Sequence, residues 1–588
     1  MPFDSFVLNA VAAEIEEKVV IPKARINKIV QPNATDIVIF FRGEAKTPLL
    51  ISSHPQWGRV HFTEHHYSRN ISPPPFCMLL RKHLKNALPL SVEQPPLERV
   101  LYLHFSSLSE EGREIVITLA AEIMGRHSNI ILLSPAEGRE SSSKVIIGAV
   151  KSIPSSINRY RTILPHYYYY PPPKQQKLHP FALDYEYFHQ MLSSYQGEKA
   201  EKVLLQNIQG LSPFLCSEIA ARAKTDYIKE NSIPSLWEKL QEIIKLYERG
   251  KWKPTLICDK DGAPMDYAAL NTVQEEKAPV RRSFNSMSMA LDEYYSHVQN
   301  KEEQKNLYAL LLQKVEQNIN KLEQKEKILL KELDETQKAD YYRTCGDLLF
   351  SFLKDVPSNA GEVYLDNIFE TGKGKIKIPL DPSLSPSLNA QAYYKKYRKA
   401  QQGRKKIKEQ LDLTRQEKTY LQSVLLALKN SDLQNLRETR DELQESGYLP
   451  PPSKKIEQKP EPSYKPMKFI SSQNEEIYVG KNNRQNDYLV QQFAPKNALW
   501  FHVKDLPGAH VVVPLEDPQE ETVKEAALLA AYFSKGASSA NVPVDFTRIK
   551  YVKRIPKGKP GAVTYKNYRT LYVTPDEDLL NPLLNRKS

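Results

Sequence analysis

Two stretches of heptad-spaced residues dominate the middle of this chain. In the first, the steps alternate between four and three residues, and Glu326 is the one break. Its members are Tyr308, Leu312, Val315, Ile319, Leu322, Leu329 and Leu333. The second stretch has the same spacing at Ile407, Leu411, Thr414, Lys418, Leu421, Leu425 and Leu428. Two such stretches predict a long antiparallel coiled coil, about 75 Å in length for about 50 residues.

A separate tip is expected between the two long helices. Residues 363–382 ("VYLDNIFETGKGKIKIPLDP") predict a β-hairpin that turns at Gly372–Gly374. A rod that carries such a tip suits contact with a distant partner, and a rod for dimerisation is the alternative.

The whole sequence predicts a multidomain α+β protein. The expected parts are a mixed α/β domain at 1–175, a helical domain at 176–285, the coiled coil at 286–447 with its tip at about 340–392, a Pro-rich linker at 448–466, and a small α/β domain at 467–588. In the helical domain, Gly210 followed by a helix from Ser212 resembles half of a helix-hairpin-helix, a turn that presents backbone N–H groups to phosphate. An ordinary helix corner is the alternative.

Composition favours a polyanionic partner and argues against metal chemistry. The 588 residues carry a formal net charge of +12. The four cysteines are far apart and form no CxxC pair, so we expect reduced thiols, no metal site and no cofactor. Neither a secretory pattern nor an apolar run of about 18 residues occurs, so we expect a cytoplasmic protein without a membrane partner.

The final domain has the strongest basic segment. No acidic residue occurs from Phe546 to Pro575, and tyrosines are interleaved with the cations. The cations that we single out are Lys553, Arg554, Lys557 and Lys559. Cations that meet phosphates and rings that stack on bases are typical of RNA binding. A solvated strand face with core tyrosines is the alternative.

A polar segment, "GKNNRQND", precedes this basic region. It is expected to be a loop whose amides contact bases or sugars and whose cations contact phosphates. Its residues are Lys481, Asn482, Asn483, Arg484, Gln485, Asn486 and Asp487. Trp500, His502 and His510 are candidate stacking groups, although either histidine is also compatible with a place in the core or in a strand.

No enzyme motif stands out. The sequence contains no GxxxxGK[ST] loop, no HExxH and no GxSxG. Pro2 ahead of a mixed domain and a helix-hairpin-helix-like turn resembles formamidopyrimidine-type DNA glycosylases, which use an N-terminal proline amine beside a glutamate. Here Phe3 follows Pro2 and no zinc finger can form, so we expect a related N-terminal fold without that chemistry.

Long strings of the chain resemble the NFACT family, also called fibronectin-binding-protein-A-like, and within it the bacterial ribosome-associated quality-control factors. The resemblance covers nearly the whole chain. It is carried by "PPPFCMLLRKHL", "AEIMGRHSNIILL", "SINRYRTILP", "LNAQAYYKKYRKA", "VGKNNRQNDYL", "WFHVKDLPGAHVVV" and "GKPGAVTY". It implies an NFACT-N domain first and an RNA-binding NFACT-R domain last.

The resemblance implies a role on the ribosome. Such factors bind obstructed large (50S) subunits that carry peptidyl-tRNA and recruit alanyl-tRNA. They direct template-free C-terminal alanine tailing of the stalled nascent chain, which marks it for degradation. The implied partners also include rRNA, a stalk-base protein and a small RNA-binding factor. Since the ribosome forms the peptide bonds, the chain itself is not expected to be an enzyme. A fibronectin-binding surface adhesin is the alternative.

The resemblance also implies site residues. The family's Asp-Arg pair falls on Glu98 and Arg99, where the acid is one methylene longer, and Asp4 matches the N-terminal aspartate. The second family motif falls on Glu122, Met124, Gly125, Arg126, His127, Ser128 and Asn129. These positions are tied to tRNA recruitment and tailing. A structural salt bridge is the alternative for Glu98 and Arg99.

Overall fold

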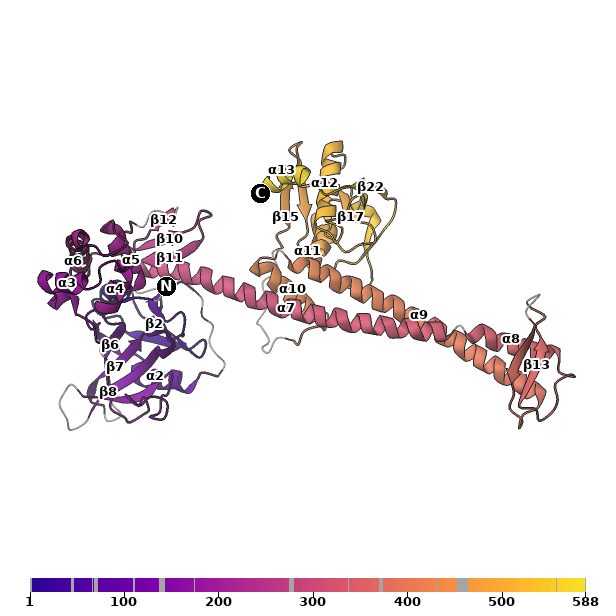
Figure 1. Ribbon diagram of the computed structural model, residues 1–588, viewed down its shortest axis with the longest axis horizontal. Helices are drawn as coiled ribbons and strands as arrows, with labels where there is room; N and C mark the ends of the chain where they lie inside the picture. The colour runs from indigo at the N-terminus through magenta and orange to yellow at the C-terminus, as the bar shows by residue number, and fades with distance from the viewer. Residues whose placement is uncertain are drawn as a thin grey trace. The chain divides into compact units, whose positions relative to one another are not determined.

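The computed structural model in Figure 1 describes most of the chain. The described residues are 3–43, 47–65, 67, 72–108, 112–136, 143–173, 175–273, 280–336, 338–369, 374–429, 431–451, 464–556 and 558–586. The chain forms two compact units, Met1–Gln299 and Asn300–Ser588, and the division falls within helix α7 (Met287–Glu335). Among the described residues, no helix is long and apolar enough to cross a membrane.

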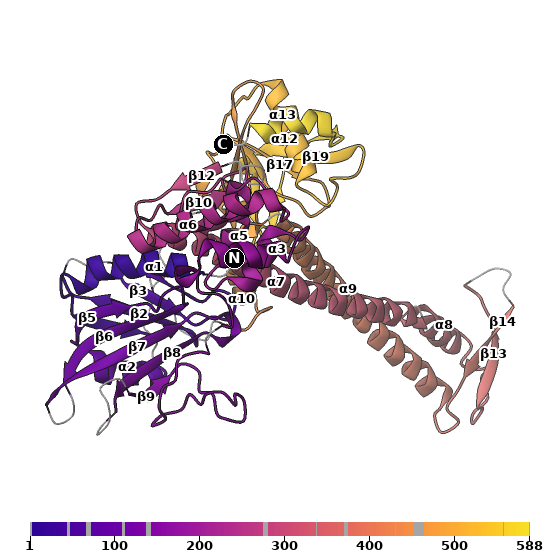
Figure 2. The same cartoon turned by 60° about the vertical axis from the view of Figure 1, so that its left-hand side comes forward.

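Two antiparallel sheets form the first half of unit 1 (Figure 2). The four-stranded sheet contains β1 (Ile26–Val30), β2 (Asp36–Phe41), β3 (Leu49–Ser52) and β4 (Arg59–Phe62) in that order. The five-stranded sheet contains β5 (Leu88–Glu93), β6 (Val100–Leu108), β7 (Glu114–Glu122), β8 (Asn129–Pro135) and β9 (Lys144–Ala149). The helical segments are α1 (Ser5–Ile15), the π-helix η1 (Glu16–Val20), α2 (Pro75–Leu84) and the 3₁₀ turn η2 (Gly125–His127). Helix α2 has Pro75 in its first turn, where the missing N–H costs little.

Short helices and a small sheet complete unit 1. They are η3 (Pro180–Ala182), α3 (Tyr185–Ser193), α4 (Ala200–Asn207), α5 (Pro213–Arg222), η4 (Glu230–Ser232), α6 (Ile233–Arg249), β10 (Thr255–Cys258), β11 (Pro264–Ala268) and β12 (Val280–Ser283). The predicted turn between α4 and α5 is present, and Gly210 has φ +80° in it. A Cβ at Gly210 would lie 2.5 Å from Cβ of Leu97, so this close approach requires glycine.

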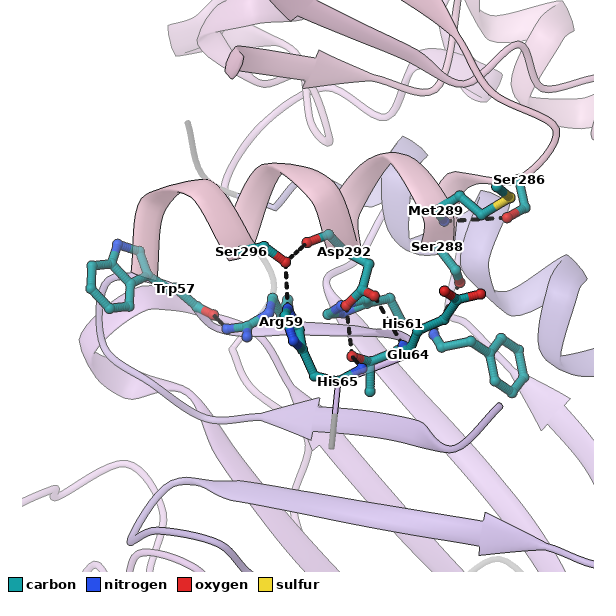
Figure 3. A network of polar contacts seen from close by, with 12 residues as sticks. Trp57, Arg59, His61, Glu64, His65, Ser286, Ser288, Met289, Asp292 and Ser296 are labelled. Atoms are coloured by element: carbon teal, nitrogen blue, oxygen red, sulfur yellow. Dashed lines mark hydrogen bonds and ion pairs between the residues drawn. The ribbon is translucent and has the colours of Figure 1, made fainter. Parts of the chain in front are cut away.

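Polar contacts fasten the start of α7 to the four-stranded sheet (Figure 3). The carboxylate of Asp292 on α7 accepts hydrogen bonds from the Thr63 hydroxyl at 2.6 Å and the Glu64 N–H at 2.9 Å. Nε2 of His61 on β4 lies 3.3 Å from the same carboxylate. Glu14 on α1 accepts from the backbone N–H of Met287. Because helix starts carry unpaired N–H groups, this carboxylate also stabilises the α7 N-terminus.

The two predicted long helices are present as α7 and α9 (Pro386–Leu428) and run antiparallel (Figure 1). Nε2 of Gln304 donates to the Ser431 carbonyl, whereas Nε of Arg415 donates to Glu326 at 2.7 Å. At two predicted positions the preceding leucine is the more buried residue: Leu307 and Leu311 are buried, whereas Tyr308 and Leu312 are half-buried. Leucines of helix α10 (Leu433–Glu445) pack into one apolar cluster with residues of α7 and α9. The apolar face is therefore wider than that of a coiled coil of two helices alone.

The tip lies at the end of the helical pair remote from α10 (Figures 1 and 2). It contains α8 (Lys338–Ser351), β13 (Glu362–Asp366) and β14 (Lys375–Pro379). The two strands pair antiparallel, as predicted for a hairpin. Residues 370–373 of its predicted turn lie outside the described residues.

The last domain is built on a six-stranded sheet in the order β15-β16-β18-β17-β19-β22. Its elements are β15 (Met467–Ile470), β16 (Glu476–Val479), α11 (Asn483–Tyr488), η5 (Leu489–Phe493), β17 (Leu499–Val503), β18 (Val511–Val513), α12 (Glu520–Tyr532), β19 (Val542–Arg548), η6 (Ile549–Tyr551), β20 (Val552–Arg554), β21 (Val563–Tyr565), β22 (Arg569–Val573) and α13 (Glu577–Asn585). Most of the Pro-rich linker, residues 452–463, lies outside the described residues.

Candidate nucleic-acid interface

The segment predicted to be a polar RNA-contacting loop is in fact a helix start. Asn482 is the N-cap of α11, and its side-chain oxygen accepts a hydrogen bond from the Gln485 N–H at 2.9 Å. Asparagine is a favoured residue at this position because it satisfies a free backbone donor. Asn482, Asn483, Gln485 and Asn486 are all buried. The loop interpretation is therefore corrected, since these amides lie inside the protein.

The buried amides of α11 bind the acidic face of α10. Nδ2 of Asn482 donates to Glu438 at 2.8 Å, and Nδ2 of Asn483 donates to Glu442 at 3.1 Å. Nε2 of Gln485 donates to Glu438 and to Oδ1 of Asn435, both at 2.9 Å. Hydrogen bonds to ionised groups are stronger than those between neutral groups. The segment thus holds the C-terminal domain on the helical pair.

Charged residues flank these amide contacts. Lys481 lies 3.6 Å from Asp432, and Arg484 pairs with Glu445 at the other end of α10. Burial raises the pKa of Glu442 to about 7, although hydrogen bonds from Tyr420 and Asn483 lower it. Asp487 accepts from the Gly561 N–H at 3.0 Å, which connects α11 to the turn between β20 and β21 of the basic segment.

The three candidate stacking residues form a cluster inside the domain. Trp500 is fully buried and His510 is 2% exposed. The ring of Trp500 stacks on His502 with a centroid distance of 5.7 Å and meets His510 edge-on at 5.3 Å. Burial lowers the pKa of His502 to about 4 and that of His510 well below its usual range. The prediction that Trp500 and His510 stack on bases is wrong for this conformation, since a base cannot reach them.

The basic segment leaves part of its charge exposed. Lys553 and Arg554 on β20 are exposed, and Arg554 lies 3.5 Å from Asp487. Lys559 instead covers the ring of Tyr448 at 4.7 Å and that of Tyr420 at 5.6 Å. Lys557 lies outside the described residues. Lys550, Lys566 and Arg569, which belong to the same basic segment, are also exposed. This surface can meet phosphates.

In unit 1, three of the predicted tRNA-contacting residues lie around the α4–α5 turn. Asp4 caps α1, accepts from the Val7 N–H at 2.9 Å and accepts from the Ser212 hydroxyl at 2.8 Å. Gln209 donates to Glu98 at 2.7 Å. Burial lowers the pKa of the half-buried Arg99, whereas the charges of Asp4 and Glu98 raise it. The anion beside the start of α5 is thus the chain's own Asp4.

The second family motif is partly structural. Glu122 is fully buried, where it forms a bidentate ion pair with Arg161 and accepts from the Tyr169 hydroxyl at 2.9 Å. Removing one partner of such a buried pair leaves an uncompensated charge. The sequence carried Arg161 within "SINRYRTILP", but no local spacing identified it as the partner of Glu122.

The turn after Glu122 presents one guanidinium and one imidazole. Ser128 is buried and accepts from the Met124 N–H at 2.8 Å, and buried Asn129 accepts from the Lys151 N–H at 2.9 Å. Arg126 and His127 are exposed, and Nε of Arg126 donates to Nε2 of His127 at 3.0 Å. The polar residues of the motif thus fix the turn that displays these two side chains.

Strand pairing places both family motifs at the same end of the adjacent strands β6 and β7 in the five-stranded sheet. Val100 on β6 pairs with Glu122 on β7, and the Ile123 N–H donates to the Arg99 carbonyl at 2.9 Å. Arg99 and the turn at 125–127 are therefore neighbours in space, although they are distant in sequence.

An α/β domain with exposed basic strands, held on a pair of long helices, defines the chain as a multidomain RNA-binding protein. Residues 4–462 match the family model of the NFACT N-terminal and middle domains, and residues 465–567 match that of the NFACT protein RNA binding domain. The chain therefore belongs to the NFACT family.

Full-length relatives agree with this membership. The Rqc2 homolog RqcH of Bacillus subtilis is 35% identical over 584 residues, which cover 98% of this chain and 99% of the relative. The Rqc2 homolog RqcH of Streptococcus suis is 36% identical, with 99% and 100% coverage. The solved N-terminal part of the fibronectin/fibrinogen-binding protein from Streptococcus suis is 33% identical with a TM-score of 0.41, and covers 50% of this chain and 99% of that chain.

Proposed function

We propose that this protein is a ribosome-associated quality-control factor. It binds large ribosomal subunits that are still obstructed by peptidyl-tRNA and recruits alanyl-tRNA. It then directs template-free alanine tailing of the stalled nascent chain, which marks that chain for degradation. This work takes place in the cytoplasm.

One observation carries the proposal: the similarity to Rqc2 homologs extends over nearly the full length of the chain and of the relatives. A match confined to one domain would support only RNA binding. Here the N-terminal, middle and RNA-binding domains all match in one chain.

The chemistry of the described residues supports a binding role. The exposed Lys553 and Arg554 suit phosphates, as do Arg126 and His127 in the first unit. We propose that peptide-bond formation is left to the ribosome and that the chain is not an enzyme.

We assign tRNA recruitment to the end of strands β6 and β7 where Arg99 and the 125–127 turn lie. Burial lowers the pKa of the half-buried Arg99, and the charges of Asp4 and Glu98 act on its guanidinium and oppose this shift. Arg126 and His127 are exposed beside it and can contact phosphate or a base face.

The test is to purify the tagged protein from growing cells and to sequence the RNA that comes with it. We expect large-subunit rRNA with one enriched tRNA and little small-subunit rRNA. The enriched tRNA names the amino acid of the tail. Equal amounts of rRNA from both subunits, or no tRNA, would contradict the proposal and favour general RNA binding or the surface adhesin.

A further inference from the structure

A cavity of about 410 Å³ lies between the α9–α10 corner and the C-terminal domain. Its helical side includes Lys429 and Ser431, and its other side includes Lys481 and Lys535. Ligand sites in proteins commonly have volumes of about 300–1,000 Å³. The cavity is thus large enough for one unit of a polymeric ligand, and two separate parts of unit 2 build it.

The charged groups of this cavity favour an anion. Lys429, Lys481 and Lys535 line it together with a single acid, Asp432. Lys481 lies 3.6 Å from Asp432, which offsets part of its charge. Lys429 and Lys535 are exposed and have no ion-pair partner within the described ranges. Two ammonium groups are therefore available to phosphate.

The remaining wall of the cavity is apolar and aromatic. Met467, Tyr532 and Phe533 line it, and all three are half-buried. An apolar wall beside cations is the combination that a nucleotide needs, because its base has a flat π-face and its phosphate is charged.

Two glycines let the backbone segments of the cavity approach closely. A Cβ at Gly480 would lie 2.1 Å from Oδ1 of Asn486, and one at Gly508 would lie 3.0 Å from Cβ of Ser534. Larger residues at these positions would push the lining segments apart. Gly480 precedes Lys481 and Gly508 pairs with Ser534 next to Lys535, so both close approaches lie beside a cation of the cavity.

We propose that this cavity binds one nucleotide of RNA, with its phosphate at Lys429 and Lys535 and its base against the apolar wall. The site is composite, because it forms only while α11 is docked on α10. Asn482 and Asn483, whose amides bind Glu438 and Glu442, also line the cavity. The amide contacts hold its two sides at a fixed distance. This assignment rests on the proposed RNA-binding function and adds a defined site to it.

The test measures binding of a short fluorescein-labelled single-stranded RNA to the full-length protein. The variant is Lys429→Gln with Lys535→Gln, and the control is Lys327→Gln with Lys331→Gln, which removes the same charge from exposed positions of α7. We expect the cavity variant to lose about tenfold or more in affinity and its log–log salt slope to fall by about 1. We expect the control to stay close to the wild type.

A second variant, Gln485→Met, keeps the size of the side chain and removes its bonds to Asn435 and Glu438. Because loss of these bonds opens the composite site, we expect Gln485→Met to bind RNA more weakly than the wild type. A measurable melting temperature of the variant would show that it is still folded. Equal RNA affinity of the cavity variant and its control would contradict the proposed site. Tighter RNA binding by Gln485→Met would also contradict it, because α10 would then be competing with RNA for α11. Failure of the wild type to bind RNA would instead contradict the proposed function itself.

Discussion

Glu326 of α7 forms ion pairs with both Arg415 and Lys418 of α9, where it interrupts the apolar heptad pattern. Lys418 is itself a heptad position, so the break in one helix is matched by a charge in the other. These hydrogen bonds from Lys418 and Arg415 lower the pKa of Glu326. A polar pair at a single core position fixes the alignment of two helices.

Glu326→Lys would therefore destabilise the helical pair by about 1–2 kcal/mol, because three cations would then meet in one place. Calorimetry of the full-length protein measures the change in the unfolding transition. The double variant Glu326→Lys with Lys418→Glu restores opposite charges and is expected to recover most of the loss. No recovery would mean that this pair does not align the helices.

The buried Glu442 makes the docking of α11 sensitive to pH. Burial raises its pKa to about 7, whereas an unfolded glutamate has a pKa of 4.5. The protonated carboxyl therefore contributes stability that is fully present below about pH 4.5 and is lost as the pH rises through about 7. The difference is about 3 kcal/mol.

Glu442→Gln would keep an acceptor for Tyr420 and Asn483 and would remove this titration. We expect the unfolding temperature of its unit to vary less between about pH 5 and about pH 8 than that of the wild type. Identical pH profiles would show that Glu442 does not titrate in this range.

The polar segment at 481–487 illustrates what the sequence could and could not predict. Its composition indicated a loop in contact with RNA, whereas the structure buries its amides at a helix start against an anionic protein surface. That surface consists of the carboxylates of α10, whose position depends on the folded path of the chain. Heptad spacing located α7 and α9 because it is a local pattern. The pairing of Glu122 with Arg161 and the burial of Trp500 depend on distant segments, so no local pattern revealed them.

The contacts between Asp292 of α7 and the four-stranded sheet should weaken in acid. Burial lowers the pKa of His61 to about 4 from 6.5, and the charge of Arg59 lowers it further, although the hydrogen bond with Asp292 opposes this. The unfolded chain takes up a proton near pH 6.5 and the folded chain does not, so stability falls as the pH drops from about 6.5 toward about 4. Thermal unfolding of His61→Asn over this range should show a smaller loss than the wild type, and an equal loss would contradict the assignment.

Exposed cations on β20 should set the salt dependence of subunit binding. Lys553→Gln removes one exposed charge and is expected to reduce the slope of log K against log salt concentration by about 1. Arg548→Gln is the matched control, because Arg548 already pairs with Glu516 and Asp517. Binding to purified large subunits at several salt concentrations measures the slopes, and equal slopes for both variants would exclude this surface.

Arg99 should act in tRNA recruitment rather than in subunit binding. We expect Arg99→Ala to sediment with large subunits as the wild type does and to lose tailing, because the guanidinium charge near Asp4 and Glu98 is gone. Arg99→Lys keeps the charge without the guanidinium and should retain part of the activity. Normal tails on Arg99→Ala would remove this residue from the recruitment site.

The most direct test of the central claim is mass spectrometry of a stalled reporter chain from cells with and without this protein. The account predicts C-terminal alanine tails of varied length that are present with the protein and absent without it. They should return with the wild-type gene and not with Arg99→Ala. Identical, untailed reporter chains in both strains would contradict the claim that this protein directs tailing.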